Sequence, residues 1–145
     1  LSRAVALLQQ ELPGSQLLVY DALRPRSVQR VLYSFVEGTP QESYVANPDR
    51  GSMHNYGCAI DLTVQAPDGQ PLDMGTAFDA FDPLSEPKRE EEYLSSGRLT
   101  RVQHANRLVL RNAMTGAGFI QLQHEWWHYD AFPGDHVRKS FRIIE

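Results

Sequence analysis

The segment from residue 58 to residue 64 constrains the fold most. Apolar side chains at 58, 60, 62 and 64 alternate with small or polar side chains at 59, 61 and 63, which is the period of a strand with one buried face. The dipeptide Asp68-Gly69 follows, and this pair strongly favours a tight turn. We therefore expect a hairpin that returns through Leu72 and Met74.

Three stretches have apolar residues at helical spacing. The first covers 4–12 and ends at Pro13-Gly14. The second follows Ser27, a favoured N-cap residue, and carries apolar residues at 28, 31, 32, 35 and 36 on one face. The third carries Val102, Ala105, Val109 and Ala113 on one side and ends at Gly116.

Two further stretches, 16–22 and 119–129, have the composition of strands. Residues 82–97 have neither period and predict a long irregular loop. Helical and strand patterns thus occur in mixed order along a chain of 145 residues, a length that suits one domain. These patterns predict a single α+β domain over 1–145, with an antiparallel sheet flanked by helices.

Composition excludes several classes of protein. A net charge of −4 with scattered basic residues argues against nucleic acid as a partner. No run of apolar residues is long enough for a membrane helix. The single Cys58 excludes an internal disulfide and a multi-cysteine zinc site. The start lacks a secretory signal, which favours the cytoplasm over the periplasm, and nothing in the sequence indicates the oligomeric state.

The segment from His124 to His128 matches H-E-x-x-H, a helical zinc motif. However, Gly116-Ala117-Gly118 and Pro133-Gly134 lie close on either side, and the aromatic residues between them favour a strand. On a strand the two histidines would lie about 13 Å apart, too far to share one ion. We therefore expect that His124 is not a metal ligand.

A second segment offers other ligands. A turn at Tyr56-Gly57 would fold His54 back over the strand that carries Asp61, and His128 would complete a set of three. Glu125 would then be free to act as a general base. The alternative is that these histidines are caps or core residues and that Glu125 is solvated.

Five short stretches together resemble a known family. They are Tyr20-Asp21-Ala22-Leu23-Arg24-Pro25, the S-x-H-x-x-G-x-A-x-D pattern of 52–61, Leu72-Asp73-Met74-Gly75-Thr76-Ala77-Phe78-Asp79, the E-x-W-H pattern of 125–128, and its extension to Tyr129. In this order they resemble the zinc D-Ala-D-Ala peptidases of the hedgehog fold, in particular the VanX-like D-alanyl-D-alanine dipeptidases.

The resemblance implies one Zn²⁺ per chain, with His54, Asp61 and His128 as its ligands. It also implies that Glu125 is the catalytic base and that Arg24 stabilises the anionic tetrahedral intermediate, a role that suits a guanidinium. The expected substrate is the small peptide D-Ala-D-Ala.

The same resemblance implies two substrate contacts. Asp79 would bind the free ammonium of a dipeptide, which would penalise an acylated N-terminus, and Ser52 would lie near the substrate. A D,D-carboxypeptidase acting on longer muropeptides and a non-catalytic zinc-binding module are the alternative functions. Leu23 departs from the aromatic residue usual in the family, and we expect the chain to begin after an N-terminal segment that helps to wall the cleft.

Overall fold

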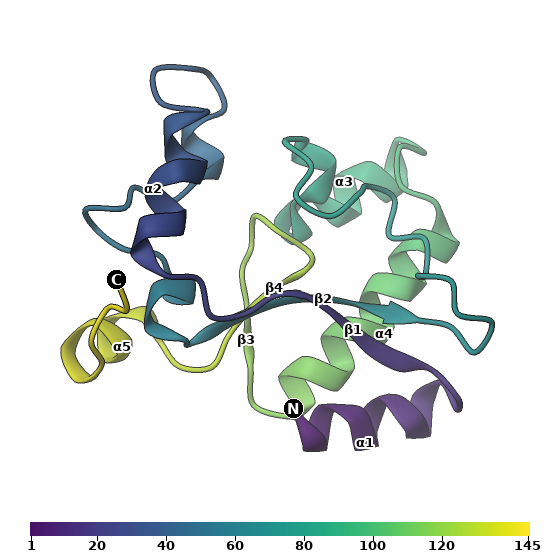
Figure 1. The fold of residues 1–145 in the computed structure, drawn as a ribbon. Coiled ribbons are helices and arrows are strands. Elements are labelled where there is room, and N and C mark those ends of the chain that lie inside the picture. The colour runs from purple at the N-terminus through teal and green to yellow at the C-terminus, as the bar shows by residue number, and fades with distance from the viewer.

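The computed structural model describes residues 1–145 and contains one four-stranded antiparallel sheet. Its strands are β1 (Gln16–Asp21), β2 (Ala59–Gln65), β3 (Ile120–Gln121) and β4 (His128–Asp130), in the spatial order β1-β2-β4-β3. β2 lies between β1 and β4 and runs through the middle of the molecule (Figure 1). The predicted α+β class and antiparallel sheet are confirmed.

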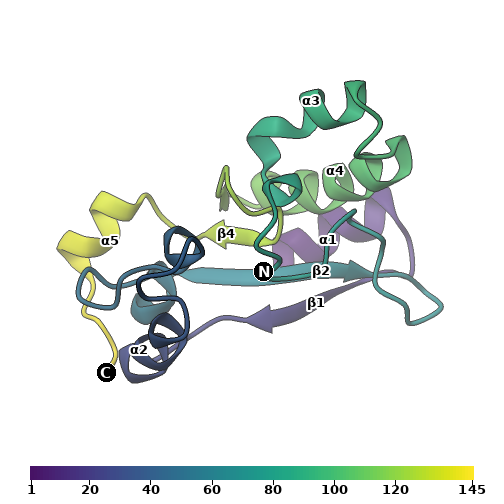
Figure 2. The same ribbon diagram turned by 90° about the horizontal axis from the view of Figure 1, so that it is seen from above.

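Five α-helices surround this sheet: α1 (Ser2–Glu11), α2 (Arg26–Ser34), α3 (Glu90–Ser95), α4 (Arg101–Gly116) and α5 (Gly134–Ser140). α1 and α4 pack against each other and against the sheet, whereas α2 and α5 lie apart from each other at its other end (Figures 1 and 2). The hydrophobic core forms where α1 and α4 meet the sheet, around Leu8, Leu62 and Leu110. No helix has both the length and the apolar character needed to cross a bilayer.

β2 differs from the expected strand in that both of its faces are buried. Ile60, Leu62 and Val64 face the core, but Asp61 and Thr63 are also only 3% and 1% exposed. The strand has a partner on each side, and its second face forms part of two cavities, one of which contains Asp61 and the other Thr63. The alternation therefore located the strand correctly, but the prediction of a single buried face was wrong.

The hairpin after β2 is shorter than predicted. Gly69 has φ +84° and ends the expected turn, and Gln65 pairs with Pro71 in a single bridge. Leu72 still donates its N–H to Val64, but no second strand forms through Met74. The pairing ends with this bond, before Met74.

The predicted strand over 119–129 is wrong, because two short strands and a turn occupy this stretch. β3 and β4 pair in antiparallel register around the turn, with Gln121 opposite Tyr129. Trp126 and Trp127 are 2% exposed, and Trp126 donates its indole N–H to the Thr76 hydroxyl at 2.8 Å. The aromatic residues that suggested a strand anchor the turn in the core instead.

The predicted loop over 82–97 contains α3 and two 3₁₀ turns, Pro83–Ser85 and Pro87–Arg89. Glu90 at the start of α3 fixes this segment to α4, because it is 3% exposed and accepts hydrogen bonds from Arg107 and Arg111. Arg107 is buried beside Glu90. The side of α4 that faces the core carries Leu110, Ala113 and Met114, whereas Val102, which was expected on that side, is 68% exposed.

α2 also departs from expectation. It begins at Arg26 after Pro25, so Ser27 is not its N-cap. The predicted apolar face is largely exposed, with Val31 at 56% and Phe35 at 76%, and the buried residue is Gln29. The Gln29 side chain instead bonds Arg24, which follows β1, and the Ala46 carbonyl.

Candidate metal centre

His54 is placed by a capped 3₁₀ turn, Met53–Tyr56. The Ser52 hydroxyl accepts the N–H of His54 at 3.3 Å, and the Asn55 side chain accepts the N–H of Ser52 at 2.7 Å. Gly57 ends the turn with φ +65°, a left-handed conformation that glycine adopts without strain. The chain thus reverses at Tyr56-Gly57, as predicted, and directs His54 toward β2.

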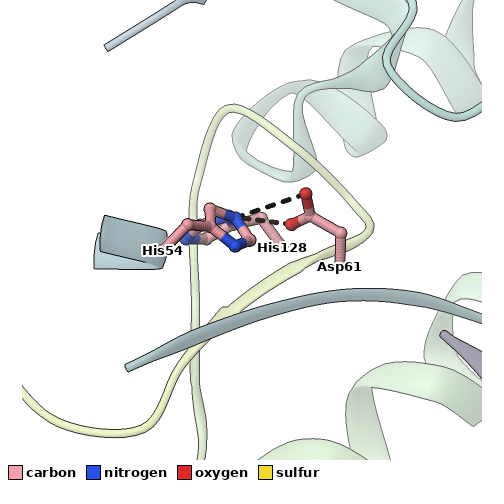
Figure 3. Close-up of side chains that lie close together, drawn as sticks. All are labelled: His54, Asp61 and His128. Carbon is pink, nitrogen blue, oxygen red and sulfur yellow. Dashed lines mark hydrogen bonds and ion pairs between the residues drawn. The ribbon is translucent and has the colours of Figure 1, made fainter. Parts of the chain in front are cut away.

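Asp61 and His128 are placed by strand pairing, because they are direct partners across β2 and β4. Residues opposite each other on neighbouring strands present their side chains on the same face of the sheet. His128 Nδ1 lies 2.9 Å from Asp61 Oδ1, and His54 Nε2 lies 3.3 Å from Asp61 Oδ2 (Figure 3). The two imidazole nitrogens are 3.2 Å apart. Three donors from distant parts of the sequence therefore converge.

Each histidine is oriented by a second contact on its outer nitrogen. His54 Nδ1 lies 2.7 Å from the Ala22 carbonyl oxygen and donates to it, which leaves Nε2 facing the cluster. His128 Nε2 lies 2.9 Å from Asp130 Oδ1, which leaves Nδ1 facing Asp61. Metal-binding histidines have such partners in most protein sites. Asp130 was not predicted, although its position two residues after His128 on a strand places it on the same face.

The donor set fits a metal ion. His54, Asp61 and His128 are all buried, and their ligand atoms lie within 4.8 Å of one another. Donors around a tetrahedral ion with bonds of about 2.0–2.2 Å are roughly 3.3–3.6 Å apart, slightly more than the separations of 2.9–3.3 Å found here. Two imidazoles and one carboxylate form a ligand set that zinc takes in catalytic sites. These three residues can bind a metal.

At the centre, burial is outweighed by hydrogen bonds, which lower the pKa of Asp61 and raise the pKa of His128. Burial raises the pKa of Asp61, but hydrogen bonds from His128 and His54 outweigh it and hold this pKa well below its usual range. Burial lowers the pKa of His128, whereas its hydrogen bonds to Asp130 and Asp61 raise it to about 10. The two carboxylates beside His128 therefore favour positive charge at this position.

Glu125 lies beside this group without belonging to it. Its Oε2 is 3.9 Å from His128 Nδ1, and its side chain is 21% exposed. Burial raises the pKa of Glu125 to about 7, and the charges of Asp61 and Asp79 add to the rise while His128 opposes it. A carboxyl group with such a pKa can both accept and return a proton near neutral pH.

Arg24 is held rigidly at the edge of the centre. Its guanidinium donates to Asp21 at 2.7 Å and to Gln29 at 2.8 Å, and lies 3.9 Å from Asp61. Its backbone carbonyl accepts from the Asn55 side chain at 2.8 Å, which ties it to the turn that carries His54. The guanidinium is therefore fixed in direction before any ligand binds.

All the predicted site residues line one cavity of about 760 Å³: Arg24, Ser52, His54, Asp61, Asp79, Glu125 and His128. Asp79 is the one residue other than glycine with a positive φ, 59°. Burial raises the pKa of Asp79, and Asp61 adds to the rise. Ser52 is 8% exposed and caps the His54 turn from the cavity wall.

His124 lies in the turn between β3 and β4, not on a strand, so the geometric reason given above for setting it aside was wrong. It lies outside the three-donor group, and its Nδ1 contacts Lys88 Nζ at 2.9 Å. The H-E-x-x-H match is therefore not part of a helix and does not bring its two histidines to one ion.

An antiparallel sheet that gathers two histidines and an aspartate beside a free glutamate has the layout of a metallopeptidase. The chain belongs to the D-Ala-D-Ala dipeptidase family, peptidase family M15, because a sequence model of this family matches residues 2–142. The resemblance seen in the sequence motifs is confirmed.

Individual relatives agree with this assignment. The chain is 37% identical over 130 residues to the D-alanyl-D-alanine dipeptidase of Escherichia coli (strain K12), a match that covers 90% of this chain and 61% of the relative. It is 32% identical over 135 residues to the D-alanyl-D-alanine dipeptidase of Enterococcus faecium, covering 80% of this chain and 62% of the relative. The chain thus spans about three fifths of the length of these curated relatives.

Proposed function

We propose that this protein is a zinc dipeptidase that hydrolyses D-alanyl-D-alanine, with one Zn²⁺ per chain. The observation that carries the proposal is the convergence of His54, Asp61 and His128 beside a glutamate that is not in the ligand group. Family membership and relatives named D-alanyl-D-alanine dipeptidase support the choice of substrate.

His54, Asp61 and His128 would hold the ion, which when bound supplies Lewis-acid character and lowers the pKa of water. Glu125 accepts the proton of the attacking water and passes it to the leaving amine, for which its pKa of about 7 is suited. This proton transfer needs Glu125 to remain free of the ion, as its position 3.9 Å from His128 Nδ1 allows.

Two further residues act on the substrate. Arg24 stabilises the negative charge that develops on the carbonyl oxygen, since its guanidinium is already fixed by Asp21 and Gln29. Asp79 binds the free ammonium group, and Ser52 contributes to the wall beside the substrate. An acylated N-terminus would place an uncharged amide against the Asp79 carboxylate, and this favours a dipeptidase over a D,D-carboxypeptidase.

The test compares zinc-loaded wild-type protein and Glu125→Gln on D-Ala-D-Ala and on N-acetyl-D-Ala-D-Ala. We expect the wild type to release D-alanine from the free dipeptide far faster than from the acetylated one. Glu125→Gln should retain its zinc and lose activity by about 10²–10⁴-fold, the usual effect of a general base. Equal hydrolysis of the acetylated substrate would indicate a D,D-carboxypeptidase, and zinc binding without turnover of either substrate would indicate a non-catalytic module.

A further inference from the structure

The cavity that contains the metal centre has a basic pair on its wall that the proposed mechanism does not use. Lys88, in the 3₁₀ turn Pro87–Arg89, contacts His124 in the turn between β3 and β4. The backbone N–H of Lys88 also donates to the Gln123 carbonyl at 3.4 Å, which joins the two turns. Lys88 and His124 line the same cavity as Glu125, and His124 directly precedes it in the chain.

The hydrogen bonds of this pair leave donors for a ligand. An ammonium group can only donate, so His124 Nδ1 must accept from Lys88, and the remaining proton of the neutral ring lies on Nε2. That Nε2–H has no partner in the protein. Lys88 has three N–H bonds, of which His124 at 2.9 Å and Glu86 at 3.3 Å account for two. One ammonium N–H and one imidazole N–H therefore remain available to a ligand, on two side chains that are exposed at the cavity mouth rather than buried.

Lys88 is itself paired with Glu86 but keeps one free N–H, whereas the two arginines of the cavity have other contacts or roles. Arg24 donates to Asp21 and Gln29, and the mechanism assigns it to the reacting carbonyl. Arg138 donates to the backbone carbonyls of Arg50 and Gly51. Apart from the candidate ligand histidines, the remaining charged side chains on the wall are the carboxylates Asp61, Asp79, Glu86, Glu125 and Asp130. A substrate anion that entered this cavity would need a cationic partner, because a desolvated carboxylate without one is costly.

We propose that Lys88 and His124 form the subsite that binds the C-terminal carboxylate of the substrate. This inference rests on the proposed function, in which Asp79 takes the ammonium group at the other end of the dipeptide. The wall of one cavity then offers a zwitterion an acidic group, Asp79, for the amine and the Lys88–His124 pair for the carboxylate. The chemical class of ligand is a small peptide or amino acid with a free α-carboxylate.

The test measures equilibrium binding to zinc-loaded Glu125→Gln protein, so that turnover does not interfere. D-Ala-D-Ala and D-alanyl-D-alanine amide are titrated by calorimetry into this protein and into the same protein carrying Lys88→Met. Lys139→Met is the matched control, since Lys139 is the other lysine of the chain, is exposed and lies outside the cavity.

We expect the protein with Lys88 to bind the acid about 10–100-fold more tightly than the amide, because hydrogen bonds to charged groups are strong. Lys88→Met should bring this ratio close to one without weakening the amide, Lys139→Met should leave it unchanged, and His124→Ala should reduce it. If Lys88→Met weakens acid and amide equally, or if the starting protein shows no preference, the subsite is refuted while the proposed substrate stands. If neither ligand binds, both the subsite and the proposed substrate are refuted.

Discussion

Asp130 Oδ1 lies 2.9 Å from His128 Nε2, while the other nitrogen of the same ring lies 2.9 Å from Asp61 Oδ1. The imidazole is therefore held between two carboxylates, one on each of the paired strands β2 and β4. This arrangement sets the ring orientation and the nitrogen that faces the centre before an ion is bound, which lowers the cost of assembling the site.

Replacement of Asp130 by alanine should weaken metal binding without removing a ligand. The loss of such an outer partner typically costs about 10–100-fold in metal affinity, and we expect a loss of this size in zinc competition with a chelator. Asp135→Ala is the control, because Asp135 is exposed on α5 outside the cavity. An unchanged zinc affinity in Asp130→Ala would show that the contact with His128 does not support the site.

Arg24→Lys should fold and bind zinc but hydrolyse D-Ala-D-Ala slowly. Lysine keeps the charge but cannot contact Asp21 and Gln29 while also presenting a planar pair of donors. The loss of one donor to the oxyanion typically costs about 10²–10³-fold in kcat. Arg30→Lys, on the exposed side of α2, is the control. Activity within a few-fold of wild type would mean that Arg24 only stabilises the end of β1.

Asp79→Asn should selectively impair substrates with a free amine. Asparagine tolerates the left-handed conformation at this position, so the substitution removes charge and leaves the backbone in place. We expect the KM for D-Ala-D-Ala to rise about tenfold or more, as for a lost charge-assisted hydrogen bond, with little change for the N-acetylated substrate. Asp68→Asn, in the remote turn after β2, is the control. Equal losses on both substrates would refute the role in amine binding.

Arg107→Met should destabilise the protein strongly. Arg107 is 1% exposed, pairs with Glu90 and donates to the carbonyls of Met74 and Leu84, which flank the segment containing Asp79. Breaking a buried ion pair from one side costs about 3–5 kcal/mol in the free energy of unfolding.

The matched control is Arg89→Met, which removes a more exposed arginine paired with Glu92 at 2.8 Å. A surface pair of this kind contributes at most about 1 kcal/mol. Urea unfolding of both variants gives the comparison, and similar losses in the two would contradict a structural role for Arg107.

Two of the three candidate ligands, His54 and Asp61, could be placed by local patterns, whereas His128 lies 67 residues from Asp61 and was assigned through the family resemblance. A strand with a clear period places Asp61, and a turn ending in glycine returns His54 to it. Asp130 could have been identified by the same reasoning, since it lies two residues after His128 and side chains two apart on a strand point to the same face. By contrast, the aromatic residues Trp126 and Trp127 suggested a continuous strand, because composition does not distinguish a strand from a turn anchored in the core.

The remaining errors concern tertiary contacts. Arg107 and Glu90 are buried because each neutralises the other across 17 residues, which no periodicity of either segment reveals. The apolar face of α2 predicted burial, yet Val31 and Phe35 are exposed, and the buried residue of the helix is Gln29, which bonds Arg24 and the Ala46 carbonyl. Local amphipathicity indicates which face can be buried, and the packing of other elements decides whether it is.

The zinc content of three variants after brief exposure to a chelator tests the ligand set most directly. His54→Ala and Asp61→Ala should each lose most of their zinc, because two remaining protein ligands rarely retain a catalytic ion against competition. His124→Ala should keep one zinc per chain, since this side chain lies outside the group formed by His54, Asp61 and His128. Elemental analysis gives the answer, and a zinc-free His124→Ala beside a zinc-loaded Asp61→Ala would contradict the proposed centre.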